Sequence, residues 1–567
     1  MNRRTFAKAS GLTATALASS APAQKLAAPR NGWQPFLTTS DPNLSRAFRI
    51  ACGDLRSNIV PWPAITSLPI PLPAKKWETL SQRIIQVAGT RDVIPSPLSF
   101  LLSGLDYGLY SFDVMMHAWD GASFLHPEAV TGSLLANLLP DDRGLRADYW
   151  ISGFGWTLGA WQHYLCTGNR PFLKVALTAT LAAFEHMERE EFDAKLNLFR
   201  GAAVIGDGIS SYPDFWVKDT PGVGHIRKWP EHHPEHKVPT GMGLPMHVLS
   251  TNCVNYQAYV IAALMQRELG LPVDTSIEQK AARLKAAINQ HFWREDAGLY
   301  RYIVDPFGGS DQQEGFGNTF AVLFGIASPE QTRRIFDGMH ITPHGIPLNW
   351  PVYPRYASAD SMSFGNHNAT VWPPVCGLWA EAAARHGHMK QFAHELKSMA
   401  DRACRDNQFA EIYHPVTGEI YGGIQESRTA RAGLAMRAFV EARLGGTGEA
   451  TPEALTKLFP PEAGKPGINR RQACGRNTFS ATAFLRTVLH GLIGIRMQPS
   501  GLTFQPCVPP GLGPIVLQDL PYRGALLQIE ITGAGQTVRK LTTNGREAKS
   551  LPATATGNQV LKIEVVS

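Results

Sequence analysis

The chain has 567 residues, too many for one ordinary domain and enough for a large packed core. Hydrophobic residues make up 44% and charged residues 18%, which excludes an intrinsically disordered protein. The net charge of +7 is small for this length and the lysines and arginines are scattered, so a nucleic-acid-binding protein is not indicated.

The first residues resemble a twin-arginine export signal. Arginines at positions 3 and 4 precede a weakly apolar run, and an A-x-A cleavage pattern ends at Ala23. We therefore expect residues 1–23 to be removed and the mature protein to be periplasmic or secreted. The alternative is a chance arginine pair in a disordered tail. No later segment has the roughly 18 uninterrupted apolar residues that a membrane helix needs, so no membrane partner is expected.

Residues 24–96 are rich in proline, interrupted by tryptophan and isoleucine, which predicts an N-terminal arm that wraps the body of the protein. From about residue 97 the sequence changes to long amphipathic stretches. In residues 276–293, apolar side chains recur at steps of four and three residues, which is one face of an α-helix. They are Ile277, Ala281, Leu284, Ile288 and Phe292.

Helical stretches repeatedly end on a glycine, after which a short turn leads into a second helix. These glycines are Gly168, Gly270, Gly325 and Gly387. Glycine suits the left-handed position that ends a helix. The last three are separated by about the length of two helices with their loops. Five or six helix pairs fit between residues 97 and 495, which predicts a closed or solenoidal array.

After Ile495, polar and apolar residues alternate in the stretches 525–533 and 558–567. This alternation predicts strands, so residues 496–567 are expected to form a small C-terminal β module that packs on the helical body. The predicted domains are therefore the signal peptide, the arm, a helical region over residues 97–495 and the β module.

The sequence has no firm pattern for a metal site or a disulfide framework. Its seven cysteines are odd in number and include no C-x-x-C pair, so buried reduced thiols are expected, and one bridge remains open. His232, His233 and His236 of PEHHPEH fit no zinc spacing, and prolines would break a helix that aligned them. We therefore expect a solvated loop there, no metal and no cofactor.

Several phrases resemble, in the same order, those of the six-hairpin glycosidases. HAWDG (117–121) with the following FLHP, YLCTGNRPFL (164–173), HNATVWP (367–373) and the run that starts with FSA at 479 carry this resemblance. The most specific phrase is EIYHPVTGE (411–419), which is similar to the glutamate loop of glycoside hydrolase family 63 and the related mannosylglycerate hydrolases.

The resemblance covers roughly residues 97–510. It implies a mainly α protein with an (α/α)6 barrel that acts as an inverting glycoside hydrolase on an α-linked glycoside or oligosaccharide. The chain departs from the family pattern in three places. Ala369 stands where glycine is usual, Phe479 replaces a tryptophan, and about 50 residues (429–478) separate the glutamate loop from the next phrase. An insertion at 429–478 could cap the active site.

An inverting glycosidase needs two carboxyl groups about 6.5–9.5 Å apart, one to protonate the leaving oxygen and one to activate a water. The resemblance makes Glu411 the general base, and a glutamate that only braces its loop is the alternative. The general acid is expected in a Gly-Asp-rich loop, where Asp207 lies between two glycines that let the backbone turn sharply. Asp214 and Glu314 are competing candidates, and an Asp-Gly turn without chemistry is the alternative for Asp207.

Polar and aromatic residues of the same phrases are candidate contacts with the sugar. A carboxylate can bind two hydroxyls, and a tryptophan ring can stack on the apolar face of a sugar. The predicted substrate-binding residues are Trp119, Asp120, His367, Asn368, Trp372, Tyr413 and His414. Core packing is the alternative for the tryptophans, and helix capping is the alternative for Asn368.

Other functions use the same helical barrel. A polysaccharide lyase or an epimerase would use histidine and tyrosine, which HNATVW and IYHP supply. A phosphorylase would replace the base with a phosphate site, and the glutamate at position 411 argues against that. A decayed barrel could also bind carbohydrate without turnover. The expected partner is a carbohydrate in each case, and the sequence does not indicate the oligomeric state.

Overall fold

The structure is a computed structural model that describes residues 34–149, 152–217, 225–356, 364–426, 468–470 and 472–567. The predicted signal peptide over residues 1–23 and most of the segment 429–478 lie outside these residues. Among the described helices, none is both long and apolar enough to cross a membrane.

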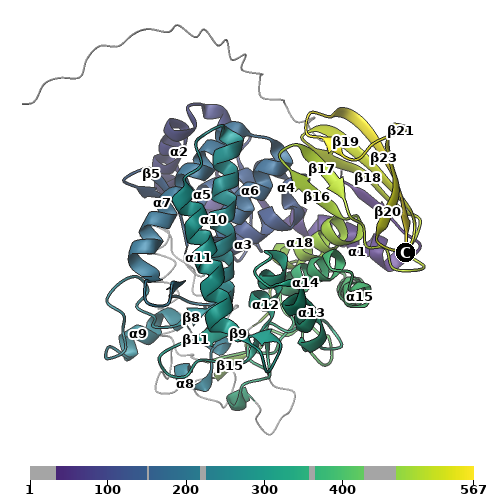
Figure 1. Cartoon of the computed structure of the whole chain (residues 1–567). Coiled ribbons are helices and arrows are strands. Elements are labelled where there is room, and N and C mark those ends of the chain that lie inside the picture. The colour runs from purple at the N-terminus through teal and green to yellow at the C-terminus, as the bar shows by residue number, and fades with distance from the viewer. Residues whose placement is uncertain (1–33, 150–151, 218–224, 357–363, 427–467, 471) are drawn as a thin grey trace, which may run out of the picture.

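Six helices of the described residues form an inner ring (Figure 1). They are α3 (Ser111–His117), α6 (Gly155–Thr167), α10 (Leu249–Leu269), α12 (Gly315–Leu323), α14 (Pro373–Arg385) and α18 (Thr478–Arg486). Each helix packs against the next, and α18 packs back against α3, so the ring is closed.

An outer helix covers each inner helix. The outer helices are α5 (Pro127–Ala136), α7 (Arg170–Glu191), α11 (Thr275–Phe292), α13 (Pro329–Gly338), α15 (Met389–Asp406) and α1 (Pro42–Ser57). A further helix, α2 (Ala74–Ala88), packs outside α7 and α5. Two concentric rings of six helices confirm the (α/α)6 barrel that the resemblance implied.

The predicted helix-ending glycines are the turns from the inner to the outer ring. Gly168 and Gly270 end α6 and α10 with φ of 68° and 73°. Gly325 and Gly387 follow α12 and α14 with φ of 65° and 84°. Left-handed backbone costs glycine nothing because it has no Cβ, so four sharp turns form without strain.

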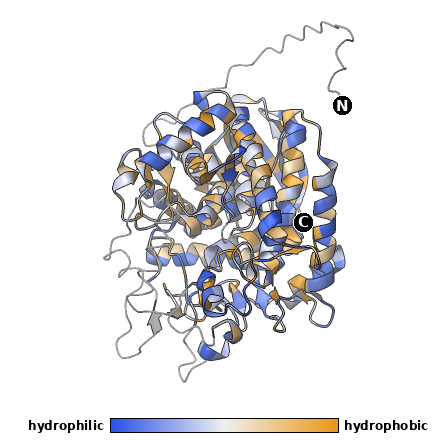
Figure 2. Cartoon of the chain, turned by 90° about the vertical axis from the view of Figure 1, so that its left-hand side faces the viewer, coloured by the Kyte–Doolittle hydropathy of each residue, from blue (hydrophilic) through white to orange (hydrophobic). Residues whose placement is uncertain are grey.

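Helix α11 shows why these segments are helical. Asp274 caps its first turn by accepting a hydrogen bond from the N–H of Ser276 at 2.9 Å. The five residues predicted to form its apolar face are all buried. Figure 2 shows the same division on the barrel helices, which carry hydrophobic residues on some faces and hydrophilic residues on others.

Helix α1 comes from the predicted N-terminal arm and takes the sixth place in the outer ring, against α18 and α15. Its buried face includes Phe48. The carboxylate of Asp54 accepts a hydrogen bond from the N–H of Phe409 at 2.8 Å. The amide of Asn58 donates to the hydroxyl of Thr478 at 2.9 Å. The sixth helix pair is therefore assembled from the two ends of the chain.

The C-terminal residues form the strand-rich module that the sequence predicted. One sheet has the order β1-β18-β19-β23-β20-β21 and a second has the order β16-β17-β22. The neighbours β19 and β23 are parallel, with Ile529 opposite Leu561, and the other pairs are antiparallel. The strands are β1 (Phe36–Thr38), β16 (Ile495–Gln498), β17 (Gly501–Phe504), β18 (Ile515–Tyr522), β19 (Gly524–Gly533), β20 (Thr537–Thr543), β21 (Arg546–Glu547), β22 (Leu551–Pro552) and β23 (Thr556–Val566).

Short two-stranded antiparallel sheets lie in the loops of the barrel. Their strands are β2 (Ile59–Pro61) with β3 (Ser99–Leu101), β4 (Leu138–Asp141) with β5 (Gly144–Ala147), β6 (Phe192–Asp193) with β7 (Leu198–Phe199), β8 (His247–Val248) with β11 (Ile303–Val304), β9 (Trp293–Arg294) with β10 (Leu299–Tyr300), β12 (Gln313–Glu314) with β13 (Asn349–Trp350), and β14 (Ile424–Glu426) with β15 (Ile468–Arg470).

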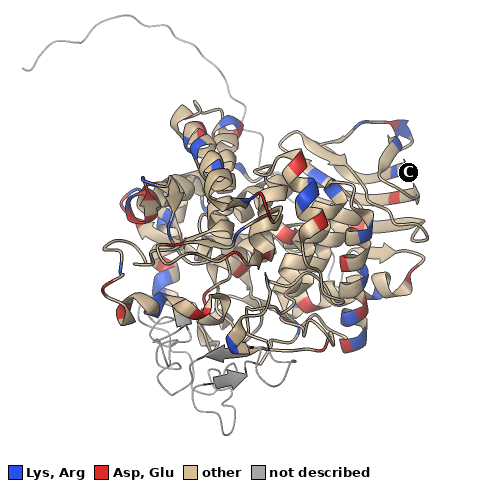
Figure 3. Cartoon of the chain, turned by 60° about the horizontal axis from the view of Figure 1, so that its bottom comes forward, with Lys and Arg blue, Asp and Glu red and all other residues tan. Residues whose placement is uncertain are grey.

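The long loops gather at one end of the barrel. Segments that leave an inner helix are short, whereas the segments that enter one are long: 192–248, 293–314, 339–372 and 407–477. We call the end where these segments enter the inner helices the loop face. It lies at the bottom of Figure 1, where α8 (Asp214–Val217) and α9 (Trp229–His232) are labelled. Figure 3 turns this end forward and shows charged residues of both signs interspersed around it.

All seven cysteines are free, as expected, and Cys474 is the one that is partly exposed.

If α1 is an integral part of the barrel, Phe48→Ala should destabilise the whole protein. Removing a fully buried phenylalanine ring costs about 3–5 kcal/mol of unfolding free energy. The half-exposed Phe36 of β1 provides the control, and Phe36→Ala should change stability by less than about 0.5 kcal/mol. Denaturant unfolding of both variants checks this. A similar small effect at both positions would mean that α1 is only an appended arm.

Candidate active site

Glu411 lies at the loop face and its carboxylate is held from two sides. The hydroxyl of Tyr107 is 3.0 Å from each carboxylate oxygen, and the N–H of Cys474 donates to Oε2 at 3.0 Å. The backbone N–H of Glu411 donates in turn to the carbonyl of Cys474 at 2.9 Å. The side chain is 4% exposed. These contacts fix the orientation of the carboxylate.

Tyr107 and Cys474 were not found by the sequence analysis. They precede α3 and α18, two inner helices that meet only where the ring closes. Neither residue lies in a phrase with a recognisable pattern, so no local signal could have paired them with Glu411.

The HNATVWP phrase lies directly beside the glutamate loop. The N–H of Val371 donates to the carbonyl of Tyr413 at 3.0 Å, and the N–H of Tyr413 donates back to Val371 at 2.9 Å. This short antiparallel bridge joins the segments that enter α14 and α18. His367 and Asn368 are thereby brought to the same end of the barrel as Glu411.

Asp207 lies in a tightly constrained turn of the segment that enters α10. The hydroxyl of Tyr212 donates to the carbonyl of Gly206 and accepts from the N–H of Ala203 at 3.0 Å. Ile205 has a φ of +64°, which is rare for a β-branched residue. Backbone strain of this kind is concentrated at functional sites, where the surrounding structure holds it in place.

The carboxylate of Asp207 lies beside the HNATVWP phrase. Its Oδ1 is 3.7 Å from Nε2 of His367, whose ring stacks on Trp372 with centroids 4.9 Å apart. The Asp207 side chain is 34% exposed, so a ligand can reach it. The structure therefore gathers Asp207, His367, Asn368 and Glu411 at the loop face.

Asn368 has unused hydrogen-bonding capacity in this region. Its side-chain oxygen accepts from the N–H of Tyr353 at 2.7 Å, whereas its buried amide nitrogen has no partner among the described residues. Helix capping does not explain Asn368, because the N-cap of α14 is Trp372. A buried amide that lacks a partner is costly, as expected for a group that binds a ligand.

Three other predicted sugar contacts have structural roles. Trp372 is buried beneath His367, and its indole N–H donates to the carbonyl of Asn366 at 2.9 Å. Nδ1 of His414 accepts from two backbone N–H groups of its own turn. Tyr413 is buried below the loop, where its hydroxyl accepts from the N–H of Ala410. The structure does not support Tyr413 as a sugar contact, because its side chain is buried and the guanidinium of Arg402 lies over its ring at 4.6 Å.

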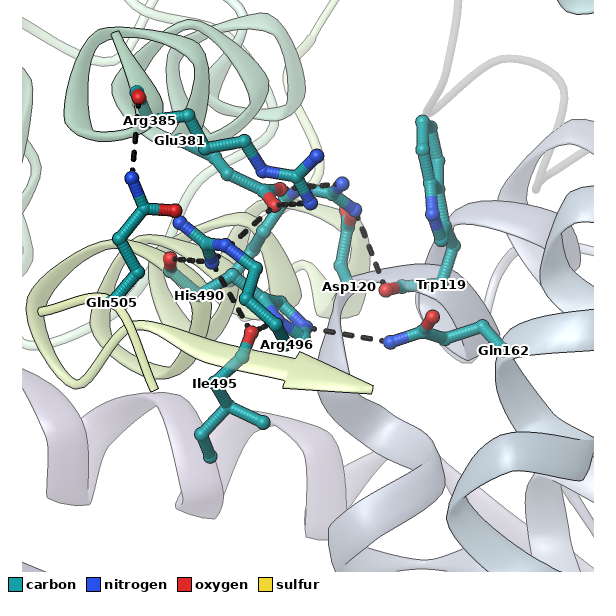
Figure 4. A network of polar contacts seen from close by, with 10 residues as sticks. Trp119, Asp120, Gln162, Glu381, Arg385, His490, Ile495, Arg496 and Gln505 are labelled. Atoms are coloured by element: carbon teal, nitrogen blue, oxygen red, sulfur yellow. Dashed lines mark hydrogen bonds and ion pairs between the residues drawn. The ribbon is translucent and has the colours of Figure 1, made fainter. Parts of the chain in front are cut away.

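Trp119 and Asp120 lie at the opposite end of the inner helices, which corrects their assignment as sugar contacts. They follow α3 in a single π-helical turn, η3 (Ala118–Ala122). Asp120 is fully buried and pairs with Arg486 at 2.7 Å. Figure 4 shows Asp120 beside Trp119 in the network of polar contacts that also includes Glu381. The guanidinium of Arg486 lies 4.1 Å above the ring of Trp119. A carboxylate beside an aromatic ring therefore serves here in a buried ion pair.

Arg486 also binds Glu381 of α14 at 2.6 Å, so one guanidinium bridges two buried carboxylates. Burial alone would raise the pKa of Glu381, but Arg385 and Arg486 outweigh it and hold this pKa well below its usual range. Glu381 consequently stays ionised. We call Asp120, Arg486 and Glu381 the closure triad, because it links α3, α18 and α14.

Arg486→Met should therefore destabilise the barrel by about 3–5 kcal/mol, since the buried carboxylate of Asp120 loses its partner and Glu381 keeps only Arg385 and the more distant Arg496. Arg333 of α13 forms an exposed ion pair with Asp337, and Arg333→Met should cost less than about 1 kcal/mol. Denaturant unfolding measures both. If Trp119 and Asp120 bound substrate, folded Arg486→Met would instead show a raised KM with little loss of stability.

Both competing candidates for the general acid already form contacts with other residues of the protein. Asp214 pairs with Arg355 at 2.5 Å, and that guanidinium is packed between the rings of Tyr353 and Tyr356. Glu314 is the N-cap of α12, is buried, and accepts a hydrogen bond from the N–H of Ser250 at 3.0 Å. Burial raises the pKa of Glu314 to about 8. It is therefore protonated at neutral pH, and its carboxyl group is less exposed than that of Asp207.

The raised pKa of Glu314 predicts a pH-dependent stability. Folding favours the protonated carboxyl, so this contribution is present below the unfolded pKa of about 4.5 and is lost as pH rises through about 8. The melting temperature of Glu314→Gln should therefore rise relative to wild type between pH 5 and pH 9. Glu419→Gln, at an exposed position, should show no such trend. A difference that is constant with pH would contradict the assignment.

Two of the three histidines of PEHHPEH pack on aromatic rings, and His232 is exposed. His233 stacks on Trp229 with centroids 4.6 Å apart, and His236 meets the edge of Phe307 at 4.8 Å. Within the described ranges, no cluster of three or more histidine, cysteine, aspartate or glutamate side chains is placed to hold a metal ion.

Comparison with known families identifies one match. Residues 156–429 match the family described as the mannosylglycerate hydrolase MGH1-like glycoside hydrolase domain. This confirms the resemblance found in the phrases. A comparison with curated protein sequences finds no match.

Among solved structures, the chain is similar to a sialidase, with a TM-score of 0.57 and 12% identity over 91% of this chain and 40% of that chain. That likeness concerns the fold alone, and this chain spans less than half of the sialidase chain. Two further similar structures are the GH63 mannosylglycerate hydrolase from Thermus thermophilus in complex with glucose (TM-score 0.45, 14% identity, 66% of this chain and 100% of that chain) and the GH78 family rhamnosidase of a Bacillus species (TM-score 0.45, 12% identity, 94% and 44%).

Proposed function

We propose that the chain is an inverting glycoside hydrolase that acts on an α-linked sugar, because residues 156–429 match an MGH1-like glycoside hydrolase domain. The observation that supports the proposal is the fixed carboxylate of Glu411. It is held by Tyr107 and Cys474 at the same end of the barrel as the partly exposed carboxyl group of Asp207.

In the proposed reaction, Asp207 donates its proton to the glycosidic oxygen as the bond to the anomeric carbon breaks. Glu411 removes a proton from a water that attacks this carbon from the opposite face of the sugar ring. The configuration inverts, the leaving group departs as an alcohol, and both carboxyl groups return to their starting states through solvent. This chemistry needs the two carboxyl groups about 6.5–9.5 Å apart, with the water between them.

Neighbouring side chains support these two roles. The hydroxyl of Tyr107 and the N–H of Cys474 keep the carboxylate of Glu411 from rotating, so that one lone pair can stay aimed at the water. His367 lies against Asp207, and the buried amide nitrogen of Asn368 has no partner among the described residues. The preferred sugar is to be found with a panel of α-linked glycosides that includes mannosylglycerate, rhamnosides and trehalose. We also propose export through the twin-arginine pattern at the N-terminus.

Glu411→Gln and Asp207→Asn should each lower kcat by about 10²–10⁴-fold with little change in KM, because general acid–base catalysis contributes that much. An aryl glycoside with a good leaving group should restore activity to Asp207→Asn but not to Glu411→Gln, since such a leaving group needs no proton. Glu419→Gln, in the same turn as Glu411 but exposed, should behave as wild type.

Asp214→Asn and Glu314→Gln separate the competing candidates. If the activated substrate restored activity to one of these variants and not to Asp207→Asn, the residue changed in that variant would be the general acid. The anomer of the first product, followed by NMR, tests the stereochemistry. An α-linked substrate should give the β anomer first, and an initial α product would refute inversion.

A further inference from the structure

A pocket adjoins the residues that hold the base. It lies at the loop face between the first and sixth helix pairs, where the end of α1 at Asn58, the segment 104–107, Gln408 and the segment 472–476 meet. Its volume is about 490 Å³. Ligand sites in proteins are typically about 300–1,000 Å³, so the pocket can hold a sugar ring.

The pocket shares two walls with Glu411. Tyr107 and Cys474 line it, and the same two residues hold the carboxylate of Glu411 through the phenol hydroxyl and the backbone N–H. A molecule in the pocket would therefore lie one side chain away from the base.

The pocket is built in advance of any ligand. The amide nitrogen of Asn58 donates to the carbonyl of Arg476 at 2.7 Å, and the side-chain oxygen of Gln408 accepts from the N–H of Arg476 at 3.0 Å. These bonds join α1, the end of α15 and the segment before α18. Because they use the backbone of Arg476, its exposed guanidinium is not needed to hold the wall together.

The chemistry of the wall suits a neutral sugar. The pocket presents one carboxylate, Asp106, and one guanidinium, Arg476, so their charges offset each other and an ionic ligand is not favoured. Carboxylate, guanidinium and amide groups form paired hydrogen bonds with neighbouring hydroxyls. Leu105, which is 49% exposed at the same wall, offers an apolar surface to the C–H groups of a sugar ring.

We infer that this pocket is a second sugar subsite on the glycone side of the cleaved bond. The inference rests on the proposed role of Glu411. In an inverting reaction the leaving group departs on the side of the acid, and the base lies across the ring from it. A pocket that adjoins the base therefore receives the next sugar of the glycone. The substrate class is an oligosaccharide whose glycone has at least two sugars.

The test compares two aryl α-glycosides that differ only in the glycone, one with the sugar that the enzyme hydrolyses and one with a second unit of that sugar. Wild type should prefer the longer glycone by about tenfold in kcat/KM, which corresponds to about 1.4 kcal/mol. Arg476→Ala should abolish most of this preference, and Leu105→Trp, which fills the pocket, should do the same. Arg539→Ala, at an exposed position of β20, should keep it.

Equal kcat/KM for the two glycosides, or a preference that survives both pocket variants, would overturn this inference while leaving the proposed function intact. No turnover of either glycoside, nor of any member of the α-glycoside panel, would overturn both. Release of the intact two-sugar glycone from the longer substrate, seen by chromatography, would support the subsite directly.

Discussion

The barrel depends on one closure, the contact of α18 with α3, which joins segments from opposite ends of the catalytic region. Arg486 makes this contact polar as well as apolar, because its guanidinium binds Asp120 beyond α3 and Glu381 on α14. All three side chains are almost completely buried, so Asp120 and Arg486 would each be costly without a partner of opposite charge. The closure triad therefore stabilises the closed ring of helices relative to an open one.

Closure at one end of the helices determines the site at the other end. Tyr107 precedes α3, Cys474 precedes α18, and both reach Glu411 only because these two helices are neighbours. Asp207 depends on a different support. Its turn packs on a small separate core that includes Tyr212, Trp216, Trp229 and Tyr302. The two proposed catalytic carboxyl groups therefore rest on different supports, which meet at the HNATVWP phrase because His367 lies against Asp207 and Val371 is bonded to Tyr413.

Features that depend on residues close together in the sequence could be predicted, whereas contacts between distant residues could not. The turn glycines and the face of α11 depend on residues a few positions apart, and these predictions were confirmed. The place of α1 was missed, because the sixth helix pair unites the two ends of the chain. The bond from Tyr107 to Glu411 spans 304 positions and has no local pattern. Trp119 was misassigned because its phrase follows an inner helix, whereas the residues of the loop face precede one.

Two strained backbone positions at the loop face indicate that its turns hold side chains in place at a cost in stability. Ile205, two residues before Asp207, and Ala369, two residues after His367, both have left-handed backbone, with φ of 64° and 61°. Such a conformation costs a residue with a Cβ roughly 1–2 kcal/mol. Glycine would remove that cost at either place. Hydrogen bonds from Tyr212 and to Asn368 hold these turns in place, so the strained backbone persists where it brings Asp207 against His367.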